Sequence, residues 1–147
     1  MLEGYTLAAI LVMVTLTLVH WRALPATIPI HFGISGKPDG WGGKESIWVL
    51  PLLAVIVNVA LSISSVFPAM QNLPFAVDRS RPEVQQLLLQ MATTMKVAVV
   101  MVLAILNWLM IEVARGRLPG LGPFLLPVIL AMILIPVSFY LVKLRQI

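Results

Sequence analysis

Four long apolar runs constrain this chain more than any other feature, and they cover residues 5–21, 47–67, 97–113 and 121–142. Each run approaches or reaches the roughly 17–25 residues that a helix needs to cross a bilayer core about 30 Å thick. Glu112 is the only charged residue inside them. Because lipid offers the backbone no hydrogen-bond partners, such runs must be helical. The runs predict an all-α integral membrane protein, with residues 1–147 forming a single domain of four transmembrane helices.

The composition agrees with a lipid environment and argues against nucleic acid as a partner. Of the 147 residues, 60% are hydrophobic and 11% are charged, whereas soluble domains average about 45–50% and about 25%. The excess of Lys and Arg lies at the ends of the apolar runs, where cations contact lipid headgroups. The absence of cysteine excludes disulfides and thiolate chemistry.

The first run could be a signal peptide or a retained span. Signal peptides begin with a basic segment and end at a small-x-small cleavage site. Here Glu3 precedes the run, and His20, Trp21 and Arg22 follow it as an interfacial anchor. We therefore expect a retained helix.

Residues 23–45 form a loop rich in glycine and proline. Pro25 and Pro29 oppose a helix, and Pro38-Asp39-Gly40 is a strong turn signal. Long loops of this kind are usually functional or disordered. Its apolar side chains, which include Phe32 and Trp41, are unlike those of a disordered linker. The loop is therefore predicted to fold, lying over the helix ends.

The polar segment 71–95 leads into the third run. Ser80 and Glu83 have the spacing of a capping box, and no helix breaker follows before Val113. This pattern predicts a helix of about 33 residues, roughly 50 Å long. Its first three turns should project into water or bend along the membrane interface, with Lys96 snorkelling at the membrane entry.

Two amides lie near the middle of predicted spans, Asn58 in the second and Asn107 in the third. Because consecutive spans are antiparallel, the two should reach similar depth and could hydrogen-bond to each other. A polar transport path is the alternative interpretation. In the fourth run, Pro127 and Pro136 predict a bent helix.

The topology places both termini and segment 71–95 on one side of the membrane, and loop 23–45 on the other. Five Lys and Arg residues fall on each side, so the positive-inside rule does not orient the chain.

Residues with catalytic chemistry are few. His31, Asp39, Lys44 and Glu45 form the one ionisable cluster away from the helix ends, and the turning loop could bring His31 and Asp39 together. The pair can be interpreted as part of a structural hydrogen-bonded loop. The alternative is a metal site with His31 and Asp39 as ligands and His20 as a possible third, although zinc requires three or four. No hydrolase, zinc-protease or phosphate-loop motif occurs. We expect no cofactor and no enzymatic activity.

The loop carries a motif with fixed spacing, which begins with Leu24 and includes Ile28. Its other positions are Pro25, Pro29, His31, Phe32, Gly36, Pro38, Asp39, Trp41, Gly42 and Lys44. This motif resembles the signature of a bacterial membrane domain of unknown function, the N-terminal part of the SdpI-type toxin-immunity proteins. The resemblance covers about residues 5–115 and continues more weakly through Pro51 and the charged segment 77–81. It implies that the ten positions other than Leu24 and Ile28 form a ligand-binding surface.

The resemblance implies a plasma-membrane protein with the loop outside and both termini in the cytoplasm. Three functions remain open. The first is an immunity or signalling protein that binds a peptide or envelope ligand through loop 23–45. The second is an assembly subunit of a larger membrane complex, with Asn58 and Asn107 contacting partners. The third is an ion-binding transporter or membrane enzyme. The ligand and the oligomeric state are not predicted.

Overall fold

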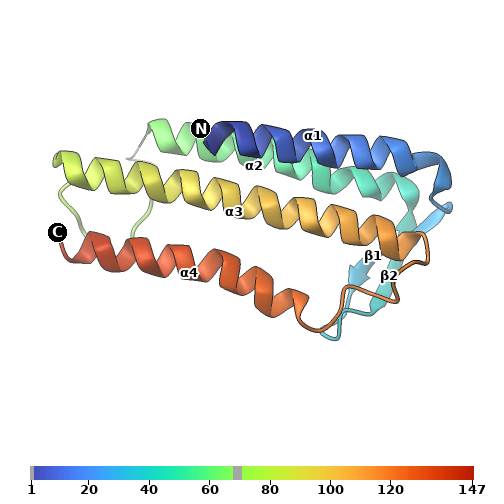
Figure 1. The fold of residues 1–147 in the computed structure, drawn as a ribbon. Coiled ribbons are helices and arrows are strands. Elements are labelled where there is room, and N and C mark those ends of the chain that lie inside the picture. Colours follow the sequence, from blue (N-terminus) through green and yellow to red (C-terminus); the bar gives the residue numbers. More distant parts are fainter. Residues whose placement is uncertain (1, 68–70) are drawn as a thin grey trace.

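Four long helices build the molecule (Figure 1). The computed structural model describes residues 2–67 and 71–147. Each of these helices is long and apolar enough to cross a membrane. Their bounds are α1 Leu2–His20, α2 Val49–Val66, α3 Pro82–Ala114 and α4 Leu125–Arg145. The predicted fold class is confirmed. Helix α2 ends at Val66, one residue before the predicted end of the second span, and Pro68, which follows that span, lies outside the described residues.

The loop between α1 and α2 is folded, as predicted, and it contains a β-hairpin that the sequence did not reveal. Strands β1 (Thr27–Phe32) and β2 (Pro38–Gly43) pair antiparallel. Two short 3-10 helices, η1 (Trp21–Ala23) and η2 (Lys44–Trp48), connect the hairpin to the flanking helices.

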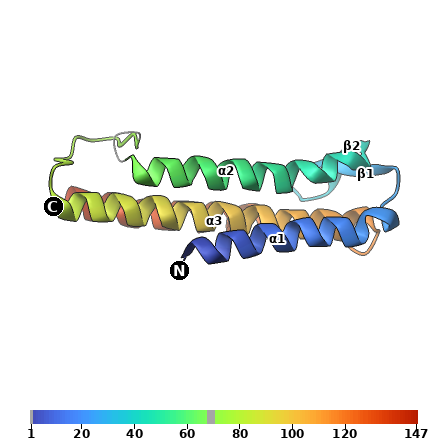
Figure 2. The ribbon, with the colours of Figure 1, turned by 90° about the horizontal axis from the view of Figure 1, so that it is seen from above.

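Helix α3 is the central element of the bundle. Helices α1 and α2 both pack against α3, and α4 lies along the side of α3 that faces away from them (Figure 1). The view from above shows α3 between α1 and α2 and largely hiding α4 (Figure 2). At 33 residues α3 has the expected length, and its first turns project beyond the ends of α1 and α2 beside the C-terminal end of α4.

Helix α4 differs from its prediction at the hairpin end. It begins at Leu125 rather than at residue 121, because residues 121–124 form a loop whose Leu121 N–H donates to the Gly36 carbonyl at 2.7 Å. Pro127 consequently lies in the first turn, where proline is tolerated, and Pro136 alone lies in the helix interior. Figure 1 shows α4 bending along its length, as expected for an interior proline.

The late start of α4 leaves the last turns of α3 uncovered, and the hairpin occupies that position (Figure 1). The hairpin therefore packs beside α3 rather than only over the helix ends. Its base is held by an apolar cluster in which β1, η2 and α3 meet. The buried members of this cluster are Leu24, Ile28, Ile47, Met110 and Ile111.

Candidate functional site

The hairpin brings His31 and Asp39 together, as the sequence predicted. The His31 Nδ1 atom lies 2.5 Å from Asp39 Oδ1, and the two side chains are 73% and 50% exposed. The strand register is irregular on both sides of His31, since His31 pairs with Gly40 while Phe32 pairs with Pro38. Such bulges redirect side chains. Here the irregularity leaves Asp39 without a directly opposed residue and beside the His31 ring.

Two glycines of β2 create the space that the β1 side chains occupy. A Cβ atom on Gly40 would lie 2.8 Å from the His31 Cβ, and one on Gly42 would lie 2.8 Å from the Ile30 Cδ1. Both distances are well inside van der Waals contact. The glycines of β2 therefore allow side chains of β1 to lie across the neighbouring strand.

The hairpin turn interlocks with the loop between α3 and α4. Gly36 has a φ of +74°, and a Cβ there would lie 2.4 Å from the Gly122 carbonyl oxygen. A Cβ on Gly120 would likewise lie 2.4 Å from the Gly36 oxygen. Only glycine permits this backbone approach. This contact was not predicted from the sequence, although the Pro-Gly-Leu-Gly-Pro run at 119–123 was an available signal for it.

Lys44 stabilises the hairpin base. Its Nζ lies 4.6 Å from the centre of the Trp21 ring, a cation–π contact, and Trp21 lies 6.1 Å from Trp48. The Lys44 N–H also donates to the Ala26 carbonyl at 3.0 Å. Lys44 therefore joins the end of α1 to the start of α2.

The predicted ligand-binding residues divide by exposure. Two are buried and serve packing, namely Pro29 and Gly36. Four are partly buried, namely Phe32, Pro38, Gly42 and Lys44. Four are exposed, namely Pro25, His31, Asp39 and Trp41. The exposed residues are the ones available to a ligand. His20 does not join His31, because its Nδ1 lies 2.9 Å from the Leu16 carbonyl. Within residues 4–67 and 71–147, no three His, Cys, Asp or Glu side chains gather as metal ligands.

The expected hydrogen bond between Asn58 and Asn107 is not formed. Asn107 lies on the face of α3 that meets α1, where its Nδ2 donates to Thr17 Oγ1 at 3.3 Å and to the Met13 carbonyl at 3.4 Å. Asn58 Oδ1 is buried and finds no hydrogen-bond partner in the described part of the chain. Both amides lie inside the α1–α3 group, so they do not present a surface to a partner protein.

Lys96 also departs from its prediction. It is 1% exposed rather than snorkelling, and its Nζ donates to Ser62 Oγ on α2 at 3.1 Å. The reason is its helical phase, because Lys96 shares a face of α3 with buried Val100, Leu103 and Asn107. A buried cation inside a membrane helix bundle is a feature commonly tied to function. The sequence interpretation placed Lys96 at the membrane border and so missed this contact.

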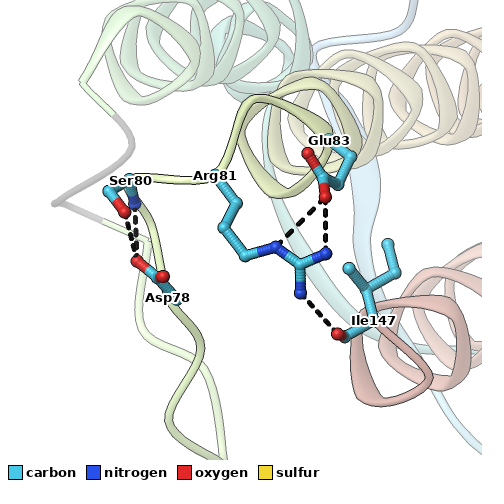
Figure 3. Close-up of polar contacts among 5 residues, drawn as sticks. All are labelled: Asp78, Ser80, Arg81, Glu83 and Ile147. Atoms are coloured by element: carbon cyan, nitrogen blue, oxygen red, sulfur yellow. Dashed lines mark hydrogen bonds and ion pairs between the residues drawn. The ribbon is translucent and has the colours of Figure 1, made fainter.

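At the other end of the bundle, Arg81 joins α3 to α4 (Figure 3). Its Nη2 and Nε donate to Glu83 Oε1, and its Nη1 donates to the Ile147 carbonyl at 2.5 Å. We call these three residues the Arg81 clasp. Beneath the clasp, Leu144 of α4 packs in an apolar cluster with Val84 and Leu88 of α3.

The predicted capping box at Ser80 and Glu83 is wrong. The N-cap of α3 is Arg81, Pro82 occupies the first turn, and no side chain caps the helix. Ser80 instead donates its hydroxyl and its backbone N–H to Asp78 Oδ1 (Figure 3), and these bonds hold the pKa of Asp78 below its usual value. The Glu83 backbone N–H and the Arg81 guanidinium hold the pKa of Glu83 below its usual value.

Comparison with known proteins places a known domain on the hairpin. Residues 8–55 match a family described as a domain of unknown function, DUF1648. An uncharacterized protein of Archaeoglobus fulgidus is 30% identical over 76 residues, which cover 46% of this chain and 42% of that protein. The chain thus spans less than half the length of that relative. No solved structure matches.

The matched segment comprises most of α1, the whole hairpin and the first turns of α2. It is shorter than the expected resemblance over residues 5–115, and the likeness to SdpI-type immunity proteins stays a prediction. Residues 8–55 are therefore similar to the DUF1648 family, and the four long helices around them are candidate membrane spans of a multi-pass protein.

Proposed function

We propose that this protein is a membrane-embedded receptor that binds a peptide or envelope ligand through residues 23–45. The observation that supports the proposal is the difference in exposure among the apolar side chains of the hairpin. Ile28 in its base is fully buried, whereas Ile34 in its turn is 91% exposed and Trp41 is 61% exposed. Apolar side chains that are held out from a fixed base contribute binding energy at little entropic cost.

The polar groups of the hairpin suit recognition better than catalysis. His31 and Asp39 are exposed and bonded to each other, and they offer two ligands where a zinc site needs at least three. An imidazole–carboxylate pair at a surface can donate and accept hydrogen bonds with a ligand. Binding without turnover is therefore the function that we assign to the pair.

The proposal requires the hairpin to lie outside the cell membrane and both termini to lie inside. The cysteine-free sequence provides a direct test. A thiol introduced as Ser35→Cys should react with a membrane-impermeant maleimide in intact cells, whereas Ser80→Cys should react only after lysis. The reverse labelling pattern would place the hairpin in the cytoplasm and remove the proposed receptor role.

Ligand capture can be tested at Trp41. A photo-crosslinking amino acid at position 41 should capture an envelope component in intact cells. The matched control is position 108 on α3, where Trp108 is 49% exposed on an apolar helix. Crosslinks at both positions to the same species would indicate unspecific lipid contact. A species captured at position 41 alone supports the receptor, and Trp41→Ala should weaken its binding about tenfold or more.

Immunity or signalling is the biological role that we propose for this receptor. Helix α3 runs from the hairpin to the Arg81 clasp, so it provides a continuous connection between the two ends. A strain lacking the protein should become more sensitive to the toxin whose peptide is captured. Unchanged sensitivity would contradict immunity while leaving ligand binding intact.

A further inference from the structure

An apolar cavity of about 220 Å³ lies where the hairpin turn meets α3 and the first turn of α4. Its walls include Phe32 of the hairpin, Leu106 of α3 and Ile129 of α4. A neighbouring cavity of about 170 Å³ shares Phe32, Leu106 and Leu121 with it. Each cavity alone is smaller than a typical small-molecule pocket of about 300–1,000 Å³, but the two together reach the lower part of that range.

The cavity lining combines polar backbone with apolar side chains. Gly33 and Gly36 of the hairpin turn contribute backbone to it. Leu106 lies eight residues inside the last residue of α3, which corresponds to roughly 12 Å along the helix axis. The hairpin backbone and an apolar side chain from within a candidate membrane span therefore line the same cavity, a combination that suits an amphiphile.

The charge at this end of the molecule favours an anionic headgroup. Five cations and three carboxylates lie on the hairpin side. Two of the carboxylates are already engaged, Asp39 by His31 and Glu112 by Arg115 and Arg117. Lys37 is exposed next to Gly36 of the cavity lining, and within residues 4–67 and 71–147 no ion pair is found for it.

We propose that this cavity holds an acyl chain of an anionic phospholipid from the leaflet on the hairpin side, with the headgroup at Lys37. The inference goes beyond the proposed receptor function, because the cavity lining and Lys37 carry it without Trp41. The acyl chain would fill the junction between Phe32, Leu106 and Ile129, and the lipid would then contribute to the attachment of α4 beside the hairpin.

The test uses the full chain in nanodiscs with two photoreactive lipids. One is a phosphatidylglycerol with a diazirine near the end of an acyl chain, and the other is a phosphatidylcholine with the same chain. Phosphatidylglycerol should label Phe32, Leu106 and Ile129 preferentially. Ile129→Trp should reduce this labelling about tenfold, the factor that burial of roughly two methylenes supplies. The control Leu134→Trp, at a 54% exposed position of α4, should not.

Lys37→Gln provides a second test that leaves the cavity walls unchanged. Removal of this charge should lower the preference for phosphatidylglycerol over phosphatidylcholine about fivefold, because one basic residue near a membrane contributes about that factor. Labelling spread evenly along α4, equal for the two lipids and insensitive to both variants, would overturn the inference.

The outcomes separate this inference from the receptor proposal. A peptide captured at position 41 together with even lipid labelling overturns the lipid assignment and keeps the receptor. Cavity labelling that responds to Ile129→Trp, without any capture at position 41, supports the lipid site and removes the receptor.

Discussion

Helices α1–α3 and helix α4 are attached to the molecule in different ways. The α1–α3 group is joined along its length by buried contacts, including the Lys96–Ser62 and Asn107–Thr17 bonds. Helix α4 buries only Leu144 among its described side chains. Helix α4 is attached at its two ends. Beside the hairpin, Gly36 contacts the backbone of residues 120–122, a contact that we call the Gly36 interlock. At the C-terminal end, the attachment is the Arg81 clasp. Between them, Thr94 on α3 hydrogen-bonds Tyr140 at 3.0 Å.

This difference indicates where the molecule can change shape. Breaking a buried bond in the α1–α3 group leaves polar atoms unsatisfied, whereas moving α4 disturbs few buried groups. A ligand under the hairpin turn would contact the moving part directly, since the cavity there is lined by α4 residues. The predictions below perturb one attachment at a time.

Gly36→Ala should have the largest effect. The substitution forces a left-handed backbone conformation on alanine, which costs about 1–2 kcal/mol, and it pushes the Cβ into the Gly122 backbone. With the overpacking term we expect a loss of roughly 2–5 kcal/mol in the free energy of unfolding. Thermal unfolding followed by tryptophan emission will measure it.

Gly116→Ala is the matched control for this prediction. Gly116 has a φ of +72°, but nothing lies within 4 Å of a Cβ placed there. It should therefore show only the conformational cost of about 1–2 kcal/mol. Equal losses for the two variants would mean that the interlock with the α3–α4 loop contributes nothing to the attachment of α4.

The pair Asn107→Leu and Asn58→Leu tests the interior of the α1–α3 group. Asn107→Leu removes bonds to Thr17 and Met13 and should cost about 1 kcal/mol, typical of interhelical bonds in membranes. Asn58→Leu removes a buried oxygen that has no partner in the described residues, so it should be neutral or stabilising. Unfolding in mixed micelles by sodium dodecyl sulfate will compare them. Equal destabilisation by both variants would contradict the prediction.

Asn58 and Asn107 also illustrate which features of the structure could be predicted from the sequence and which could not. Four helices, the length of α3 and the folded loop followed from runs of apolar residues and from Gly and Pro positions. The meeting of His31 and Asp39 followed from the turn between them. The partner of Asn107 and the burial of Lys96 did not, because they depend on how α3 is rotated against α1 and α2. That rotation is set by packing that involves the whole bundle.

The β-hairpin could not be predicted from the sequence for a different reason. Residues 38–43 read Pro-Asp-Gly-Trp-Gly-Gly, a composition that strands disfavour. Strand β2 forms because its glycines accommodate the side chains of β1, a long-range fit that local propensity does not record. The Gly36 interlock joins residues more than 80 positions apart and was hidden in the same way.

Arg81→Ala should loosen the C-terminal end of α4 only slightly, because the clasp is an exposed set of charged bonds that solvent screens. A nitroxide on Gln146→Cys should become more mobile, and high salt should produce the same mobility in the unsubstituted chain. Arg145→Ala, an equal charge change without an ion pair in the described residues, is the control. Equal mobility in both variants would show that net charge, rather than the clasp, holds this end.

The smallest effect should come from acid. The pKa values of Asp78 and Glu83 lie below their ordinary values of 3.8 and 4.5. Both carboxylates therefore stabilise the fold above those ordinary values, and the contribution is lost as the pH falls through the lowered folded-state values. A nitroxide on Gln86→Cys should keep its mobility from pH 7 to about 5 and gain mobility at lower pH. The double variant Asp78→Asn, Glu83→Gln should lack this acid response. If it kept the response, carboxylates other than Asp78 and Glu83 would be responsible for it.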